Sequence, residues 1–328
     1  MIKFTKGLLY HRLGEAMVSI WTHVKLVIVV IIWGFGWPAG RVVADTVPPF
    51  TAGWIRYLIA VACFLIFLKA SGNWRVPTKA EWKTLAIIGF FSTFLYQAFF
   101  MYGMKYTAAG DASLMITFNP FFTSLLAIIF LSEKMTLRYV FGLILGISGI
   151  AVLFIYSPNV DIPFNERLLG DILIAGSALA WACSSILKKK MMTQPAKDAE
   201  EPLSPLHLTV WASTIGFGIQ TVPFIAEVSQ VGISNPSFDA WVGIIFLAVF
   251  STVLSYVWFA DGIRTIGAGP ASMYVYLVPI FGIFSGWLLL DEKLGLSLLI
   301  SFVLIVSGLL ISQYKHDAKN QNHIKQES

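Results

Sequence analysis

Apolar stretches of about twenty residues recur ten times along this chain of 328 residues and leave little length between them. A helix of that length spans the hydrocarbon core of a bilayer. Only 12% of the residues are charged, whereas a soluble domain carries about 25%. The sequence therefore predicts an all-α polytopic membrane protein with ten transmembrane helices and no room for a soluble catalytic domain. The runs cover roughly 24–44, 50–69, 84–104, 108–131, 137–156, 169–188, 204–226, 240–262, 270–290 and 295–313.

Two parts of the sequence match each other at a constant offset of 159 residues. The stretch FNPFFTSLLAIIFLSEKMTLRYVFGLILGISG, which begins at Phe118, aligns without a gap with LVPIFGIFSGWLLLDEKLGLSLLISFVLIVSG, which begins at Leu277. Extended backwards, the match has roughly 20 identities over about 70 positions, which indicates internal duplication rather than shared hydrophobicity. The aligned pairs include Pro120 with Pro279, Glu133 with Glu292, Gly110 with Gly269, and the FST motifs at Phe91 and Phe250.

Each copy of the repeat contains five apolar runs, which is an odd number, so the two copies must cross the membrane in opposite directions. Inverted repeats of this kind build transporters whose substrate site lies between the halves near the bilayer midplane. Met1 and Met17 both remain open as the start of the protein. We expect an N-terminal segment at 1–23, a first five-helix repeat at 24–156, an external loop at 157–168, a second repeat at 169–313 and a tail at 314–328.

Lysine and arginine residues are concentrated in alternate loops, and such loops face the cytoplasm. This asymmetry predicts a multi-pass protein of the cell membrane with both termini in the cytoplasm. The net charge of +5 is explained by these loops, and no loop interleaves basic and aromatic residues as a nucleic-acid site would. The expected partners are the lipid bilayer and a small-molecule substrate, with no nucleic acid; a homodimer remains open. Cys63 and Cys183 lie inside apolar runs and are expected to be buried and inert.

Three motifs of the first repeat point to a known family. They are Trp33-Gly34 in the first run, Pro49 with Arg56 in the second, and NPFFTSLLAIIFLSEK followed by GLILGISG; the second repeat has VPIFGIFSGWLLLDEK. Together they resemble the EamA branch of the drug/metabolite transporter superfamily over about residues 24–313. The resemblance implies carriage of small organic metabolites, often export of amino acids or related compounds.

A secondary carrier that works by alternating access is the first functional hypothesis, with a broader drug-like or nucleotide-sugar carrier as the alternative. A polytopic membrane enzyme is disfavoured because the sequence has no His or Cys cluster of metal-ligand spacing, no Ser/His/Asp set and no paired carboxylates. A channel is disfavoured because neither a selectivity filter nor a ring of charge is visible. We therefore expect no enzyme activity, no catalytic or metal-binding residues and no cofactor. Substrate, direction and coupling ion remain open.

Few polar and aromatic side chains fall deep inside the apolar runs. Interhelical hydrogen bonds and a water-filled substrate cavity would satisfy their polar atoms equally well. Gln97 and Tyr256 are aligned in the repeat, and Trp33 and Trp181 are approximate equivalents. An amphipathic substrate between the first, third, fourth, sixth, eighth and ninth runs suits such walls. The predicted substrate-binding residues are Trp33, Trp37, Gln97, Asn119, Trp181, Tyr256 and Tyr274.

Three prolines interrupt apolar runs near their middles: Pro38, Pro120 and Pro279. GFGWPAG at Gly34 imitates a dinucleotide fingerprint, but it lies inside an apolar run rather than between a strand and a helix. Pro38 instead removes one amide and crowds the carbonyl of Gly34. The prolines are interpreted either as marks of moving, substrate-lining helices or as packing kinks.

Charged residues near the ends of the runs are predicted to have gating or structural roles. For Arg56 three roles remain open: extension towards the membrane surface, pairing with Asp111, or binding of a substrate carboxylate. Glu133 and Glu292 are each expected to contact the amide-rich start of the helix that follows them, near Thr136 and Gly295. Their spacing also predicts ion pairs between Arg41 and Asp45 and between Asp261 and Arg264.

Overall fold

The computed structural model describes residues 2–72, 74–131, 135–159, 161–233 and 235–313. Glu133 lies outside these ranges. Every regular element within them is a helix, which confirms the predicted all-α membrane protein. Nine helices of the described chain are long and apolar enough to cross a bilayer, and a further apolar helix, Leu296–Ser312, is shorter. The nine spans are Ile20–Thr46, Pro49–Ala70, Lys79–Tyr106, Ala109–Phe130, Leu137–Tyr156, Phe164–Met192, Pro205–Val231, Phe238–Ile266 and Ala271–Leu290.

Several spans consist of two or three successive helical segments. The elements of the first part of the chain are α1 (Ile2–Thr46), α2 (Pro49–Ala70), α3 (Lys79–Gly89), η1 (Phe90–Leu95), α4 (Tyr96–Tyr106), α5 (Ala109–Met115), η2 (Ile116–Phe118), α6 (Asn119–Leu131) and α7 (Leu137–Tyr156). Those of the second part are α8 (Phe164–Thr193), α9 (Pro205–Val231), α10 (Phe238–Ile245), η3 (Phe246–Leu254), α11 (Ser255–Ile266), α12 (Ala268–Tyr274), η4 (Val275–Leu277), α13 (Val278–Leu290) and α14 (Leu296–Gln313).

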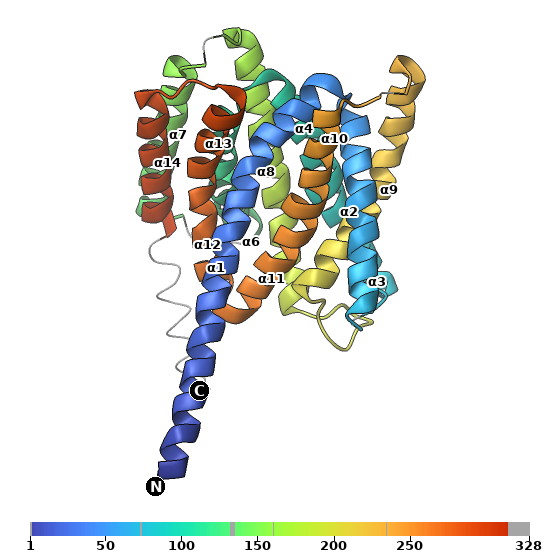
Figure 1. The fold of residues 1–328 in the computed structure, drawn as a ribbon, viewed down its shortest axis with the longest axis vertical. Coiled ribbons are helices and arrows are strands. Elements are labelled where there is room, and N and C mark those ends of the chain that lie inside the picture. The colour runs from blue at the N-terminus through green and yellow to red at the C-terminus, as the bar shows by residue number, and fades with distance from the viewer. Residues whose placement is uncertain (1, 73, 132–134, 160, 234, 314–328) are drawn as a thin grey trace.

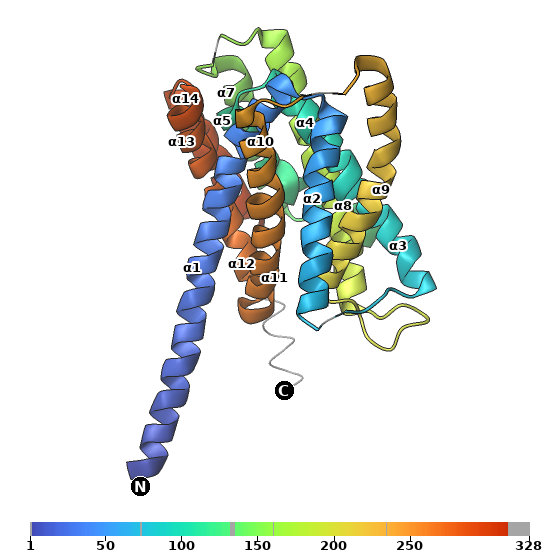
Figure 2. The ribbon, with the colours of Figure 1, turned by 45° about the vertical axis from the view of Figure 1, so that its right-hand side comes forward.

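The spans stand side by side in one bundle (Figure 1). Helices α7 and α14 form a pair at one edge, and α2, α3 and α9 lie at the opposite edge in both views (Figures 1 and 2). Helix α1 is continuous from Ile2 to Thr46, and its first turns extend below the bundle. Residues 2–23 therefore share one helix with the first span. Helix α14 runs towards the end of the bundle from which α1 emerges (Figure 1).

Pro38 in α1 leaves the carbonyl of Gly34 without its usual intrahelical donor. The structure supplies a donor from another helix, because Oγ of Ser285 in α13 lies 3.1 Å from this carbonyl oxygen. Gly34 permits the close approach: a Cβ there would lie 2.3 Å from Cβ of Phe281. Serine hydroxyls of neighbouring helices are one way in which membrane proteins satisfy backbone groups freed by proline. The predicted disturbance at Pro38 is thus absorbed in the α1–α13 contact.

Pro120 and Pro279 are each preceded by one turn of 3-10 helix, η2 and η4. The N–H of Asn119 donates to the carbonyl of Ile116, and the N–H of Val278 donates to the carbonyl of Val275. These are the carbonyls that the missing proline N–H groups would otherwise have bonded. The tighter turn therefore satisfies them, at equivalent positions 159 residues apart.

The third and eighth spans each contain a π-helical segment, η1 at Phe90–Leu95 and η3 at Phe246–Leu254. Ser255 shows the wider turn at the end of η3, because its backbone N–H donates to the carbonyl of Phe250, five residues earlier. With the offset of 159 residues, η1 falls inside η3. The aligned parts of the sequence therefore share two departures from α-helix, one π and one 3-10.

Glycines allow α7 and α14 to touch backbone to backbone. A Cβ on Gly142 would lie 2.3 Å from the carbonyl oxygen of Gly308, and one on Gly308 would lie 2.4 Å from that of Gly142. The GLILG motif alone suggests a one-sided contact, because its equivalent begins SFVLI. That interpretation is wrong: Gly308, seven residues further along, provides the glycine from α14.

Candidate substrate cavity

A cavity of about 400 Å³ lies inside the bundle. Its walls come from the first four spans and from the sixth, eighth and ninth, so α2 joins the helices predicted to surround the substrate. Five of the seven predicted substrate-binding residues line it: Trp33, Trp37, Asn119, Trp181 and Tyr256. Arg56 and Pro120 line it as well.

Six aromatic rings follow one another around the cavity, and each touches the next. The centroid distances run from 5.4 Å, between Trp37 and Phe100, to 6.3 Å, between Trp33 and Tyr256. Both parts of the sequence contribute to this chain of rings, four from the first and two from the second, and the rings give the cavity a largely apolar wall. The order of the rings is Trp33, Tyr256, Trp181, Tyr96, Phe100 and Trp37.

Arg56 of α2 lies at the cavity wall with 5% of its surface exposed. Its Nη1 donates to Oε1 of Gln97 at 2.9 Å. Its Nη2 and Nε donate to Oγ1 of Thr252 at 2.9 and 3.3 Å. The possibility of a pair with Asp111 is wrong, because Asp111 bonds other groups at one end of the bundle. Arg56 instead joins α2 to α4 and to the π-helical segment η3.

The remaining predicted residues lie outside the cavity lining. Gln97 is buried behind Arg56 and supports it. The hydroxyl of Tyr274 contacts Nδ1 of His23 on α1. Pro38 and Pro279 are buried in the helices that form the walls.

The cavity also has lining residues that the sequence did not single out. Tyr96 and Phe100 complete the chain of rings, and they were missed because aromatic residues are common throughout the apolar runs. Ser251 carries a usable signal, since it belongs to the repeated FST motif, and its backbone carbonyl accepts the indole N–H of Trp33 at 3.0 Å. Further lining residues of this kind include Thr123, Ser124 and Phe259.

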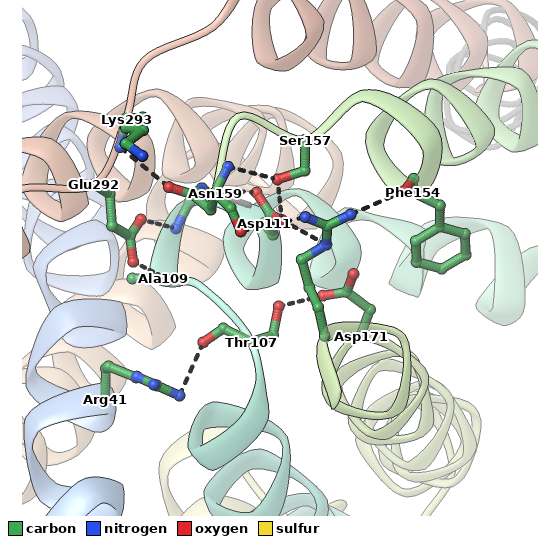
Figure 3. Close-up of polar contacts among 12 residues, drawn as sticks. Arg41, Thr107, Ala109, Asp111, Phe154, Ser157, Asn159, Asp171, Glu292 and Lys293 are labelled. Atoms are coloured by element: carbon green, nitrogen blue, oxygen red, sulfur yellow. Dashed lines mark hydrogen bonds and ion pairs between the residues drawn. The ribbon is translucent and has the colours of Figure 1, made fainter. Parts of the chain in front are cut away.

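A buried polar network fills the end of the bundle opposite the first turns of α1 (Figure 3). Asp111 in α5 is at its centre and has no exposed surface. It accepts the hydroxyl of Ser157 at 2.7 Å and the amide of Asn159 at 3.4 Å. The nearest cation is Arg167 of α8, whose Nε lies 3.9 Å from Oδ2 of Asp111.

Asp171 is a second fully buried carboxylate in this network. Its Oδ1 accepts the hydroxyl of Thr107, while among the described residues its Oδ2 has no hydrogen-bond partner. Arg167 is anchored beside it by the carbonyls of Phe154, at 3.0 Å, and Asn159, at 3.3 Å. This residue was missed because the predicted sixth span starts at 169. Helix α8 begins at Phe164, so Asp171 lies two turns inside the helix.

Glu292 contacts a helix N-terminus, but not the one predicted. Its carboxylate accepts the backbone N–H groups of Ala109 and Gly110, the first two residues of α5, rather than the start of α14 (Figure 3). Burial raises the pKa of Glu292 above its ordinary value, and these two N–H groups and the charge of Arg41 oppose that rise. Glu292 contacts α5 rather than α14 because the residue before it, Asp291, adopts a left-handed conformation (φ 54°) that redirects the chain after α13.

Arg41 closes the same end from α1. Its Nη1 donates to the carbonyls of Met104 and Lys105 at 2.7 and 2.6 Å, and its Nε lies 3.5 Å from Asp45. The predicted pair between Arg41 and Asp45 is thus present. So is the pair between Arg264 and Asp261, at 2.8 Å.

The structure adds one ion pair that was not predicted and allows two other predictions to be compared with the described residues. Lys25 shares Asp261 with Arg264, at 2.9 Å. Thr136 accepts the N–H of Tyr139 and caps α7, the helix start expected to follow Glu133. Cys63 and Cys183 are free thiols and only half-buried, which corrects the expectation that they are buried.

The protein is similar to known proteins in both sequence and fold. A curated relative, the uncharacterized transporter YyaM of Bacillus subtilis (strain 168), is 27% identical over 84% of this chain and 90% of its own length. A probable amino-acid metabolite efflux pump of Escherichia coli (strain K12) is 26% identical over 89% of this chain and 94% of its own. A crystal structure of a protein with 17% identity covers 89% of this chain and 96% of that one with a TM-score of 0.62, which shows the same fold.

The sequence profile described as the EamA-like transporter family matches residues 20–155 and again residues 168–314. These two matches cover most of the chain and contain every residue that lines the cavity. The protein is therefore a membrane transporter rather than an enzyme, and it belongs to the EamA-like transporter family.

Proposed function

We propose that this protein exports amino acids or related small metabolites across the cell membrane by alternating access. The observation that carries the proposal is the cavity of about 400 Å³ inside the bundle, bounded by spans from both parts of the sequence. Its volume falls within the range of about 300–1,000 Å³ typical of small-molecule sites. Transporters with inverted repeats bind their substrates in such a place.

The chemistry of the cavity wall supports a small metabolite with both apolar and polar parts. The chain of six rings offers apolar area, and a few groups offer hydrogen bonds. Asn119 is one of these groups, although its Oδ1 already accepts the hydroxyl of Thr123 at 3.1 Å. The name of the Escherichia coli relative, a probable amino-acid metabolite efflux pump, favours this substrate class and the outward direction.

Two inverted five-helix halves, 24–156 and 169–313, form part of the proposal. The 3-10 turns before Pro120 and Pro279 and the π-helical segments η1 and η3 support them, because both features recur at the offset of the sequence repeat. We place both termini in the cytoplasm, on the distribution of basic loops and on the common direction of the start of α1 and the end of α14 (Figure 1). The loop 157–168 is then external.

We further propose that, in this orientation, the cavity faces the cytoplasm. Lining residues extend towards the cytoplasmic ends of the helices: Ser185 lies near the end of α8, and Ser272 near the start of α12. The opposite end is filled by the network around Asp111 and by the contact of Glu292 with α5. Export requires this outer end to open, and we propose that the wall helices interrupted by Pro38, Pro120 and Pro279 move when it does.

The test is transport by purified protein in liposomes loaded with a panel of amino acids and their derivatives. Single replacements Trp33→Ala, Gln97→Ala, Asn119→Ala and Tyr256→Ala should change the half-saturation concentration or the maximal rate. Trp287→Ala is the matched control, because Trp287 lies outside the cavity and 45% of its surface is exposed. Membrane insertion is checked separately. Unchanged transport in all four correctly inserted variants would show that the substrate binds elsewhere.

A further inference from the structure

We propose that the substrate is a small organic anion whose carboxylate binds Arg56 while its apolar body lies against the ring chain. This assignment rests on the proposed transport function of the same cavity. The proposed substrates are therefore 2-oxo or N-acylated relatives of an amino acid, which carry a net negative charge, rather than the zwitterionic amino acid itself.

The first observation is the unused bonding capacity of Arg56. A guanidinium has five N–H groups. Three of those of Arg56 are used, one by Gln97 and two by Thr252, and within the described chain the other two have no acceptor. No carboxylate of the described residues forms an ion pair with Arg56. A charge at membrane depth without a counter-ion is costly, and an anionic ligand would supply that counter-ion.

The second observation is a neighbouring donor that also lacks an acceptor. The indole Nε1–H of Trp37 is buried and has no hydrogen-bond partner in the part of the chain that the structure describes. Trp37 and Arg56 both contact the ring of Phe100, with centroid distances of 5.4 Å for Trp37 and 5.7 Å for Cζ of Arg56. Both residues line the cavity. Two donors without acceptors, each on a residue beside the ring of Phe100, fit a ligand that carries a group that only accepts, as an ionised carboxylate does.

The third observation concerns the positive end that a zwitterion would bring. Among the described residues that line the cavity, none is Asp or Glu. The ring of Trp181, which would otherwise attract a cation, already has Nζ of Lys188 at 4.4 Å from its centroid. A substrate ammonium therefore finds no carboxylate in the described lining, and the ammonium group of Lys188 over the Trp181 ring would repel it.

The hydrogen bonds of Arg56 position the guanidinium for this task. Gln97 holds it from α4, and Thr252, itself bonded to the carbonyl of Leu247, holds it from η3. A fixed guanidinium loses little further freedom when a planar carboxylate binds. Because these contacts come from both parts of the sequence, an anion at Arg56 would sit between the proposed halves.

The decisive experiment compares solutes that share one phenyl body and differ in charge. Binding to the wild-type protein is measured by quenching of tryptophan fluorescence and by counterflow in liposomes. We expect 3-phenylpropanoate to bind at least about tenfold more tightly than 3-phenylpropanamide, 3-phenylpropylamine or phenylalanine, since a charge-assisted hydrogen bond contributes roughly that factor or more. Equal or tighter binding of the amide, the amine or phenylalanine overturns the proposal.

Variants then assign the effect to Arg56. Arg56→Gln should weaken binding of 3-phenylpropanoate at least about tenfold and leave that of 3-phenylpropanamide within about twofold, whereas Arg56→Lys should retain part of the preference for the anion. Trp37→Phe keeps the ring, removes the donor and should weaken only the anion. Arg264→Gln is the control, because Arg264 is 81% exposed and remote from the lining. If Arg56→Gln fails to fold, the binding of the four phenyl solutes to the wild type and to Trp37→Phe tests the proposal.

The outcomes also separate this inference from the function on which it rests. If neutral or cationic metabolites are transported and Arg56→Gln transports them unchanged, the protein is a carrier and the anion assignment is wrong. If neither the phenyl series nor the metabolite panel binds or moves in either direction, both proposals are wrong.

Discussion

The carboxylate of Glu292 and the backbone N–H of Gly110 are joined at 2.9 Å, although 182 residues separate them in the sequence. Glu292 follows α13, and Gly110 lies in the first turn of α5. Negative charge is favourable at the N-terminus of a helix, where N–H groups lack intrahelical partners. The contact is therefore a direct bond between the end of one span and the beginning of another, at the end of the bundle away from the cavity.

Replacing Glu292 with Gln should alter how stability depends on pH. Burial holds the pKa of Glu292 above the ordinary value of 4.5, so the folded protein binds more protons than the unfolded chain in the window above that value. The contribution of this group to stability is complete below pH 4.5 and is lost as the pH rises through the folded-state pKa. The melting temperature of the wild type relative to Glu292→Gln should fall across this window.

This prediction is checked by thermal unfolding in detergent from about pH 4 to about pH 8, with both proteins in the same buffers. Taking the difference between the two proteins removes the titration of all other groups. A difference that grows with pH would contradict the prediction and would mean that the charged form is the one stabilised in the folded protein.

Arg167→Gln should destabilise the protein strongly, by about 3–5 kcal/mol, because it leaves the buried carboxylates of Asp111 and Asp171 without their nearest cation. The yield of monodisperse protein and its melting temperature measure the loss. A second replacement, Asp111→Asn, should restore part of it. Arg264→Gln removes an exposed ion pair and should cost at most about 1 kcal/mol. Equal effects of the two arginine replacements would argue against a structural role for the network.

Gly142→Ala should lower stability by about 1–3 kcal/mol, because the added Cβ would lie 2.3 Å from the carbonyl oxygen of Gly308 and force α7 and α14 apart. Gly218→Ala is the matched control: it is also a helical glycine, and a Cβ there meets nothing within 4 Å. That replacement should be neutral or gain up to about 1 kcal/mol from helix propensity. Melting curves in detergent provide the comparison, and similar curves for the two variants would refute the α7–α14 contact.

Reporter fusions test the orientation in the membrane. Fusions after Thr46, Lys79 and Ser328 should report outside, inside and inside respectively, because basic residues cluster in the loops assigned to the cytoplasm. A reporter pair that is active only outside or only inside makes each fusion its own control. An outside signal from the fusion after Ser328 would contradict the prediction that both termini are cytoplasmic, and with it an even number of spans.

Much of the architecture could be predicted, because the lengths of the apolar runs and the register of the repeat can be read directly from the sequence. Pro120 and Pro279 were recognised as equivalent, and the structure gives both the same 3-10 turn. Five of seven proposed contact residues line one cavity, since deep aromatic and polar residues in a membrane bundle usually face its interior. Tyr274 does not, because depth alone does not give the rotation of a helix.

The ion pairs within one helix turn, Arg41–Asp45 and Asp261–Arg264, were predicted, but the partners of charged residues on other helices could not be. Arg56 was considered as a partner of Asp111, but it bonds Thr252 in the π-helical segment of the eighth span instead. Glu292 binds α5 rather than α14 because the chain turns at Asp291, a non-glycine residue with positive φ. Asp171 was not singled out, because the helix that carries it begins at Phe164, earlier than the apolar run. These partners depend on where helices begin, turn and change their winding, which the apolar pattern does not give.

The π-helical segments η1 and η3 have a consequence for any experiment that scans these spans residue by residue. An α-helix presents the same face about every 3.6 residues, whereas a π turn takes in one residue more. The pattern of reagent accessibility along the third and eighth spans should therefore change phase at Phe90–Leu95 and at Phe246–Leu254. A helical wheel drawn through either segment assigns residues on one side of it to the wrong face, and two wheels are needed for each span.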